Sequence, residues 1–387
     1  MKLSQRAKNI APSATLAIAA KAKELRAQGK PILSFSAGEP DFTSPRAACD
    51  AAIEAIKRGE THYTPNSGII ELKKAISDYY RTRFGLDYPT AEIIVTSGAK
   101  PLLYEALQAL VDPGDEVLLF APAWVSYVEQ INLAEGLAVP VKTLESGFVP
   151  TRDEIEKNIT PGTTGMIINT PNNPTGAVYD EPTLRMLADV AVRHDLWIIF
   201  DEIYERLVYG VTKHINILQA APEIRGRVIL ANGVSKAYCM TGWRIGYALG
   251  PREVIMKVDD IQSHLTSNAS SIAQWASVGA IKEAESDVER CRVEFGKRRD
   301  LIYGLLSGID GLHIQKPDGA FYAFVDIRGA KVPDDIEFCQ RLLEERHVAV
   351  VPGAAFLAPG FLRMSYACSE ADIKEGVARL AKFVDSL

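Results

Sequence analysis

Residues 228–250 read VILANGVSKAYCMTGWRIGYALG, and the rest of the chain is interpreted from this stretch outward. It begins with a β-branched run typical of a buried strand, breaks at Asn232-Gly233, and then places Lys236 among small residues, followed by Arg244. A lysine beside apolar and aromatic neighbours loses hydration of its charged form, so its pKa should fall and free amine becomes available to form a Schiff base. The guanidinium of Arg244 suits a phosphate dianion. The stretch predicts a site for a phosphorylated aldehyde, and a salt-bridged pair at a sheet rim is the alternative.

The composition is that of a large globular protein. The chain has 387 residues, of which 47% are hydrophobic, so it can bury a sizeable core, and its length favours two domains. The net charge of −6 argues against nucleic acid or an anionic membrane as a partner. No signal-peptide pattern opens the chain and no run has the apolar length of a membrane span. The five cysteines form no CxxC or Cys/His cluster, which predicts a cytoplasmic protein without a structural metal.

Helical and extended patterns alternate through the first two thirds of the chain. Helices are expected over 70–84, 102–110 and 182–194, and strands over 92–96, 116–120, 166–169 and 196–200. This alternation predicts an α/β fold with a mostly parallel sheet and flanking helices, followed by an α+β pattern. The expected division is an N-terminal arm with part of the small domain over 1–45, a large domain over 46–285, and a small C-terminal domain over 286–387. The arginines of the helix expected over 287–306 should be solvated.

Residues suited to ligand binding follow the expected strands. Small residues before Lys100 join one strand to a helix, and the free N–H groups of such a turn can hold an anion. Trp124 follows the next strand, where it can stack on a flat ring or pack in the core. Asn173 lies in the turn TPNNPTG and offers a donor to a ring oxygen.

Two charged residues stand in apolar strand patterns. Asp201 ends the run 196–200, and because a buried carboxylate needs a partner, a protonated pyridine nitrogen is one candidate. Tyr204 falls on the same face of a helical turn and can reach the same ring. Arg363, inside FLRMSY, should face a carboxylate, with that of a bound substrate as the attractive candidate. Tyr63 lies in an exposed-looking loop that suits an interface or a ligand.

Taken together, these motifs resemble the class I aminotransferases, which have the fold-type I pyridoxal phosphate architecture, and the resemblance covers essentially the whole chain. Each motif alone is modest, but their joint occurrence in order and spacing is highly specific. The matching motifs are SAGEPDF with Gly38, HYTPNSG with Tyr63, PAWVSY with Trp124, NTPNNPTG with Asn173, DEIY with Asp201 and Tyr204, SKAYCMTGWRIGYA with Lys236 and Arg244, PDGAFY with Gly319, and RMSYA with Arg363.

The resemblance implies a role for each site residue. Lys236 holds pyridoxal 5'-phosphate as a Schiff base and moves the substrate proton, Asp201 holds the pyridinium, and Trp124 stacks on the ring. Asn173 and Tyr204 hold the phenolic oxygen. The phosphate lies among Gly98, Ala99, Lys100, Ser235 and Arg244, and Tyr63 reaches it from a second subunit, which implies a homodimer. Gly233 departs from the serine of many relatives, so one phosphate hydrogen bond is missing or comes from Ser235.

Within the class, the sequence looks most like the aspartate aminotransferase branch. In that branch an N-terminal PSAT segment, here with Ser13 and Thr15, and a lysine at the phosphate turn, here Lys100, serve the substrate. The resemblance implies amino transfer from aspartate or glutamate to 2-oxoglutarate or oxaloacetate, with the substrate also held by Gly38, Trp124, Asn173 and Arg363.

Other activities stay open to different degrees. An aminotransferase of broader range, acting on aromatic amino acids or prephenate, and a lyase on the same fold are both alternatives. A cofactor-binding regulator is disfavoured because no DNA-binding module fits before Pro31. A nicotinamide dehydrogenase is disfavoured because no GxGxxG opens a strand-to-helix turn.

Overall fold

The computed structural model describes residues 1–332 and 334–387, and its larger sheet has seven strands. Across the sheet they are β2 (Ile93–Thr96), β8 (Gly246–Leu249), β7 (Val228–Gly233), β6 (Trp197–Asp201), β5 (Thr163–Asn169), β3 (Glu116–Ala121) and β4 (Leu137–Lys142). Strand β8 pairs antiparallel with β2 and β7, and the other neighbours pair in parallel. The predicted α/β fold with a mostly parallel sheet is confirmed.

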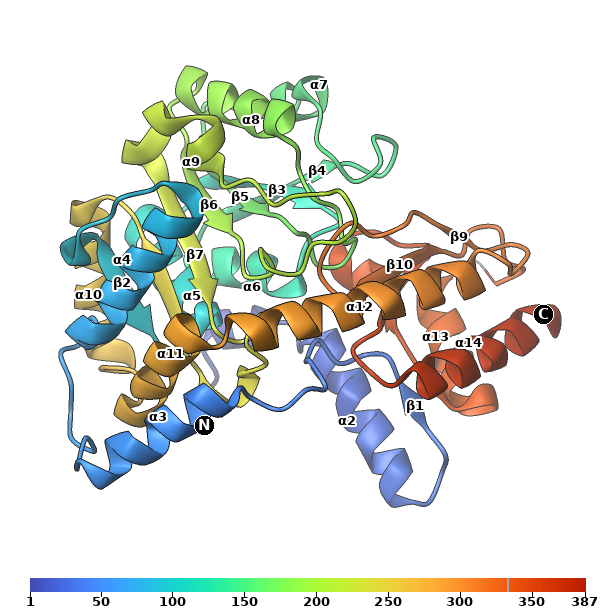
Figure 1. Ribbon diagram of the computed structural model, residues 1–387. Helices are drawn as coiled ribbons and strands as arrows, with labels where there is room; N and C mark the ends of the chain where they lie inside the picture. Colours follow the sequence, from blue (N-terminus) through green and yellow to red (C-terminus); the bar gives the residue numbers. More distant parts are fainter. Residues whose placement is uncertain (333) are drawn as a thin grey trace.

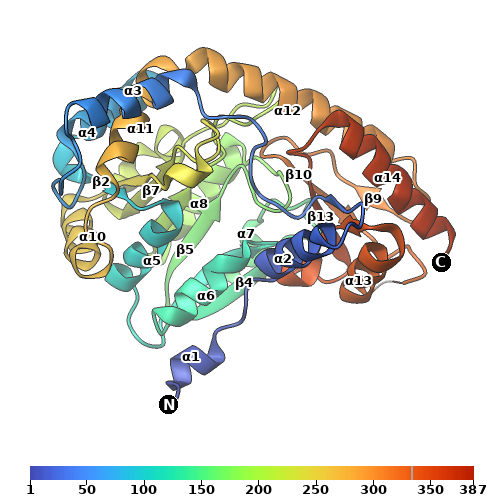
Figure 2. The same ribbon diagram turned by 90° about the horizontal axis from the view of Figure 1, so that it is seen from below.

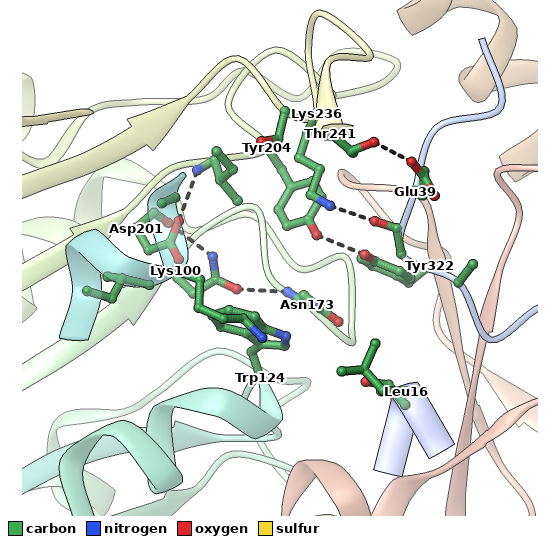
Figure 3. Close-up of a pocket in the computed structure, with 18 of the residues that line it drawn as sticks. Leu16, Glu39, Lys100, Trp124, Asn173, Asp201, Tyr204, Lys236, Thr241 and Tyr322 are labelled. Atoms are coloured by element: carbon green, nitrogen blue, oxygen red, sulfur yellow. Dashed lines mark hydrogen bonds between the residues drawn. The ribbon is translucent and has the colours of Figure 1, made fainter. Parts of the chain in front are cut away.

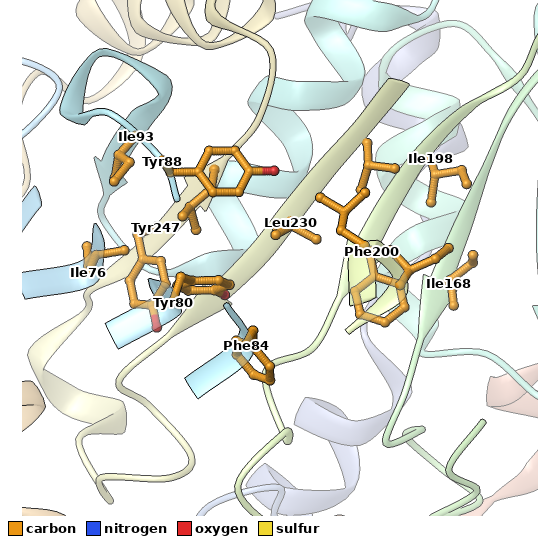
Figure 4. Packing of buried hydrophobic residues seen from close by; sticks show 14 of the residues in the cluster. Ile76, Tyr80, Phe84, Tyr88, Ile93, Ile168, Ile198, Phe200, Leu230 and Tyr247 are labelled. Carbon is orange, nitrogen blue, oxygen red and sulfur yellow. The ribbon is translucent and has the colours of Figure 1, made fainter. Parts of the chain in front are cut away.

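Helices cover both faces of this sheet (Figures 1 and 2). One face packs against α3 (Arg46–Lys57), α4 (Ile70–Phe84), α8 (Glu181–Arg193), α9 (Ile217–Ala220) and α11 (Ser271–Glu283), and the other against α5 (Ala99–Leu110), α6 (Val125–Leu133) and α10 (Arg252–Leu265). Successive side chains of a strand point to opposite faces, so Ile198 and Phe200 join the first core and Ile199 the second. Figure 4 shows Phe200 and Leu230 in the first core, to which Tyr80 of α4 also belongs. Burial on both faces explains the apolar strand sequences.

A smaller antiparallel sheet follows in the last third of the chain. Its order is β12 (Val351–Pro352), β13 (Phe361–Ser365), β10 (Tyr322–Asp326) and β9 (His313–Ile314), and it is accompanied by α13 (Asp335–Arg346) and α14 (Glu370–Asp385). Helix α12 (Glu285–Leu306) runs from the end of α11 toward this sheet (Figure 1). The N-terminal segment also joins this part of the chain, because β1 (Leu33–Ser34) pairs in parallel with β11 (Val348–Ala349) in a separate two-stranded sheet. The domain limits stay a prediction.

The remaining helices of the described chain are α1 (Gln5–Asn9), α2 (Ala14–Ala27) and α7 (Arg152–Glu156). Single 3₁₀ turns lie at Thr90–Glu92, Pro222–Arg227, Thr241–Trp243 and Gly353–Phe356. In the part of the chain that the structure describes, no helix is both long enough and apolar enough to cross a bilayer.

Helix α5 and strand β4 differ from the sequence prediction. Helix α5 begins at Ala99, earlier than the predicted residue 102, because Pro101 lies in the first turn, where the missing N–H costs no helical hydrogen bond. Strand β4 was not predicted. It pairs with β3 alone among the described strands, contains Pro140 and has several exposed residues, so it lacks the continuous apolar run of the central strands.

The prediction that the arginines of α12 are solvated is wrong for two of them. Arg298 and Arg299 are only 6% and 7% exposed. The Arg298 guanidinium donates to Asp41 at 2.7 Å and lies over the Phe42 ring at 4.9 Å. The loop after β1 therefore covers this part of the helix, a tertiary contact that the sequence of the helix alone does not reveal.

Candidate active site

A cavity of about 500 Å³ opens at the carboxyl ends of the parallel strands (Figure 3). Both sheets and the N-terminal helix α2 contribute to its walls. Of the residues predicted for the site, those that line it are Thr15, Gly38, Ala99, Lys100, Trp124, Asn173, Asp201, Tyr204, Ser235, Lys236, Arg244 and Arg363. The fold brings these residues together although they are far apart in the chain, because parallel strands present their carboxyl ends at one edge of the sheet.

Asp201 ends β6 and is 4% exposed. The Tyr127 hydroxyl donates to its Oδ2 at 2.7 Å, and the Ile203 N–H donates to its Oδ1 at 3.1 Å. Burial raises the pKa of Asp201 to about 6 despite these hydrogen bonds. A cation in the cavity would favour its ionised form. Tyr127 was missed by the sequence analysis, although PAWVSY places it on the same helical face as Trp124.

Lys236 lies in the connection between β7 and β8, the antiparallel pair formed by the stretch that opened the sequence analysis. Its Nζ donates to the Gly38 carbonyl oxygen at 2.6 Å (Figure 3). Burial, helped by the positive charge of Arg363, lowers the pKa of Lys236 to about 8. About one tenth of the folded chains therefore have the free amine at pH 7, far more than for an ordinary lysine, and the predicted lowering of the pKa is confirmed in direction.

Close packing of the backbone explains why residue 233 is a glycine. It pairs with Gly246 across β7 and β8, and a Cβ at Gly233 would lie 2.8 Å from the Ile245 carbonyl oxygen and 3.1 Å from the Gly246 Cα. Because the obstacle is backbone, a serine here would require the strands to move apart. Ser235 lines the cavity and offers a hydroxyl instead.

The turn before α5 brings the Arg244 guanidinium against the start of the helix. Gly98 caps the helix with φ of 104°, and among the described residues no side-chain cap hydrogen bond is made to its first turn. A side chain at Gly98 would collide with the Arg244 guanidinium, so glycine allows the cation to lie against the helix N-terminus. Arg244 is held by its Nη1, which donates to the Thr241 carbonyl oxygen at 2.9 Å. Helix dipole, backbone donors and guanidinium together suit a phosphate.

Arg363 of β13 supplies a second, buried cation. It is 2% exposed, and its Nη1 and Nη2 donate to Asn173 Oδ1 at 2.9 Å and to the Ser36 carbonyl oxygen at 2.7 Å. Its buried Nε has no hydrogen-bond partner among the described residues. This orphaned donor has capacity for a carboxylate in the cavity.

Lys100 lies at the more exposed rim. Its Nζ is 4.7 Å from the centre of the Trp124 ring, and partial burial together with Arg244 lowers its pKa. Thr15 and Leu16 of α2 line the same cavity. The Ser13 and Thr15 hydroxyls lie 3.0 Å apart, but Ser13 is not among the lining residues.

Two tyrosines of the site prediction have different surroundings. The Tyr204 hydroxyl lies 2.8 Å from that of Tyr322, a lining residue that the sequence analysis missed although it belongs to the PDGAFY motif. Tyr63 is 92% exposed and does not line the cavity of the single chain. Its exposure agrees with the predicted loop, and its role toward a second subunit stays a prediction.

The architecture is that of an α/β protein with a cavity at the carboxyl edge of a mostly parallel sheet, the place where folds of this kind bind their ligands. Comparison with known proteins identifies the family. Residues 30–380 match the family described as aminotransferase class I and II, and the chain belongs to that family. The resemblance inferred from the motifs is confirmed.

Similar proteins cover the whole length. The aspartate aminotransferase of Geobacillus stearothermophilus is 45% identical over 393 residues, covering 100% of both chains. The aspartate/prephenate aminotransferase of Thermus thermophilus is 44% identical, covering 98% of each. The aspartate aminotransferase structure from Rhizobium meliloti superposes with a TM-score of 0.96 at 42% identity, covering 100% of this chain and 99% of that one. The Thermus thermophilus aspartate aminotransferase solved with maleate gives 0.95 at 43% identity, covering 99% of each.

Proposed function

We propose that this aminotransferase uses pyridoxal 5'-phosphate to move an amino group between aspartate or glutamate and a 2-oxoacid, 2-oxoglutarate or oxaloacetate. The observation that carries the proposal is a lysine of lowered pKa in one cavity with a buried carboxylate and a guanidinium beside a helix N-terminus. The names of the similar proteins support the substrate class. Maleate, bound in one of the similar structures, is itself a dicarboxylate.

The residues fit the cofactor group by group. Among the described residues Asp201 forms no ion pair, and a pyridinium nitrogen would supply its cationic partner. Lys236 offers an amine to the aldehyde carbon. Gly98, Ala99, Ser235 and Arg244 suit the phosphate, Trp124 the ring face, and Asn173 and Tyr204 the phenolic oxygen. When bound, the cofactor supplies an electron sink for the charge that develops at the substrate α-carbon.

The protein contributes binding, orientation and proton transfer. Asp201, held by Tyr127 and the Ile203 N–H, would hold the cationic nitrogen of the cofactor through its negative charge. Lys236 is the base that takes the α-proton and returns it, and its pKa of about 8 is close to the range in which a general base is most effective. Arg363 binds the α-carboxylate.

Substrate choice requires a second cation, because every amino acid has an α-carboxylate. Lys100 is that cation in this proposal: its ammonium lies over Trp124 at the rim of the cavity and can meet a distal carboxylate. Thr15 adds a hydroxyl group at the same cavity, and the Ser13 hydroxyl lies 3.0 Å from it without lining the cavity.

The experiment is a donor screen on the purified, cofactor-loaded enzyme. Single amino acids are added and the cofactor absorbance change is followed, and then each oxoacid acceptor is tested for reversal. Aspartate and glutamate should react fastest. Borohydride reduction followed by peptide mapping should place the pyridoxyl label on Lys236, and a label on another lysine would contradict the assignment.

A broader substrate range, with aromatic amino acids or prephenate, is the second candidate, because some similar proteins are named aspartate/prephenate aminotransferases. The apolar surfaces of Leu16 and Trp124 at the cavity favour it. Prephenate as acceptor in the same screen tests this. A lyase would release product from the amino acid without any requirement for an acceptor.

The proposed active unit is a homodimer, and the proposed compartment is the cytoplasm. Each chain is divided into the domains predicted above. Exposed Tyr63, on a loop without a core contact of its own, is assigned to the phosphate of the partner subunit. Mixing Tyr63→Phe and Lys236→Ala chains should form hybrids in which one of the two shared sites is wholly wild type. A fully active monomer, or no recovered activity in verified hybrids, would contradict shared sites.

A further inference from the structure

Two buried thiols lie side by side next to the lysine-bearing connection. Cys239 follows Lys236 in the same turn, and Cys291 lies on α12, far away in sequence. The Cys239 Sγ donates to the Cys291 Sγ at 3.8 Å, and the two residues are 9% and 4% exposed. Both are free thiols in this structure.

We propose that Cys239 and Cys291 are a site of reversible oxidative modification, in which a peroxide converts the thiol pair to a disulfide that ties the Lys236 connection to helix α12. The two sulfurs already face each other, and they must approach by roughly 1.7 Å to reach the bonded separation of about 2.05 Å.

A small oxidant has a route to Cys239. This residue lines a surface pocket beside Arg244, together with Ser44, Cys49 and Trp243. The Cys291 sulfur lies behind it, 3.8 Å from the Cys239 sulfur. The hydrogen bond from Cys239 lowers the pKa of the Cys291 thiol, and Arg290 acts in the same direction, so the pair contains a thiol that ionises more readily.

The chemistry balances with hydrogen peroxide as the oxidant. One sulfur of the pair, as the thiolate, attacks one peroxide oxygen, the O–O bond breaks, and the departing hydroxide takes the proton released from that thiol and leaves as water. The second thiol then attacks the sulfenic acid so formed, the S–O bond breaks, and the hydroxyl leaves as a second water with the proton of the second thiol. Two thiols are oxidised by two electrons, and the peroxide is reduced to two waters. A dithiol reverses the step by exchange.

The disulfide would alter the active site through the backbone. Helix α12 is long and packed, whereas Cys239 lies in a turn with φ of 54°, its carbonyl oxygen accepting from Ser44 at 3.2 Å. The turn therefore makes most of the adjustment, and the Cys239 N–H is bonded to the Lys236 carbonyl oxygen at 3.3 Å. A displacement of about 1 Å in a catalytic group can cost up to about 100-fold in rate, so a loss of about 10-fold is expected.

The test uses the cofactor-loaded enzyme, reduced, desalted and treated with hydrogen peroxide. Peptide mapping should find Cys239 joined to Cys291, with an intact mass lower by two hydrogen atoms. Activity should fall as the cross-link forms and return with dithiothreitol. The proposal is overturned if peroxide leaves both thiols free for alkylation, or if a fully cross-linked sample keeps full activity.

Two variants provide matched controls. Cys49→Ser removes the neighbouring thiol of the same pocket and should leave both cross-link and inactivation unchanged, whereas Cys291→Ser should abolish both. A disulfide that contains Cys49 contradicts the assignment. If Cys291→Ser does not fold, the mapping of the wild-type chain still decides the outcome.

Discussion

At the floor of the cavity, Asp201 is buried and its two carboxylate oxygens are already held by Tyr127 and the Ile203 N–H, whereas at the rim Lys100 is exposed and its ammonium lies over the Trp124 ring. The floor is built from strand ends, the rim from helix starts. Burial fixes geometry and shifts protonation before a ligand arrives, and exposure leaves a flexible cation free to adapt. In the proposed function, therefore, the floor determines the reaction and the rim selects the substrate.

The largest effect is expected from Asp201→Asn. The substitution removes the fixed charge opposite the proposed pyridinium, and truncating one member of a buried charge pair costs roughly 2 to 5 kcal/mol. At the upper end this corresponds to a loss in kcat/KM of about 1000-fold or more, equal for all donors. Steady-state kinetics with aspartate and alanine check it. A loss confined to aspartate would place Asp201 in substrate selection and break the comparison.

The second largest effect on activity is expected from a substitution at the rim. Lys100→Ala should lower kcat/KM for aspartate by roughly 10 to 100-fold, while phenylalanine and alanine stay nearly unchanged, because the ammonium is exposed and is shared with the phosphate turn. Arg363→Ala is the matched control, since loss of the buried cation should weaken all donors alike. If Lys100→Ala lowers every donor equally, the lysine serves the cofactor, and the preference for acidic substrates loses its main support.

The residues at the floor of the cavity were easier to predict from the sequence than the residues that contact them. Asp201 and Lys236 could be predicted because each stands at the end of an apolar run, a pattern that fixes both strand and edge. Tyr127 and Tyr322 could not be placed in this way, because tyrosines in half-buried patterns are ordinarily core residues. The burial of Arg298 depends on the loop with Asp41, a contact across more than 250 residues that local pattern does not encode.

A third effect tests the cost of the buried carboxylate itself. The folded-state pKa of Asp201, about 6, lies above its ordinary value, so the folded chain binds the proton more tightly and stability falls as pH rises from about 4 to about 6. Without cofactor at pH 8, Asp201→Asn should therefore be more stable than the wild type. The gain should be about 1 to 2 kcal/mol after allowance for a lost hydrogen bond.

Urea unfolding of the cofactor-free proteins at pH 8 and pH 5 measures this difference. It should shrink at pH 5, where the wild-type carboxyl group is already largely protonated in the folded state. Asp201→Asn should thus be more stable and less active than the wild type. This is expected if the buried charge of Asp201 destabilises the cofactor-free protein and is stabilised by the bound cofactor. An equal stability difference at both pH values would show that ionisation of Asp201 is not its origin.

The smallest effect concerns the pH dependence of Lys236. With a pKa of about 8, about one tenth of the folded chains have the free amine at pH 7 and about half at pH 8. The initial rate at which cofactor-free enzyme captures pyridoxal phosphate should rise about fivefold over this unit and less than twofold over the next, whereas an ordinary lysine would give about tenfold for each. Because the charge of Glu39 raises the pKa of Lys236, Glu39→Gln should move the midpoint to lower pH. Lys100→Ala, a change at the rim, should leave the midpoint in place. A rate that still rises tenfold between pH 8 and pH 9 would mean that burial does not lower this pKa, and the contrast between floor and rim would lose its electrostatic basis.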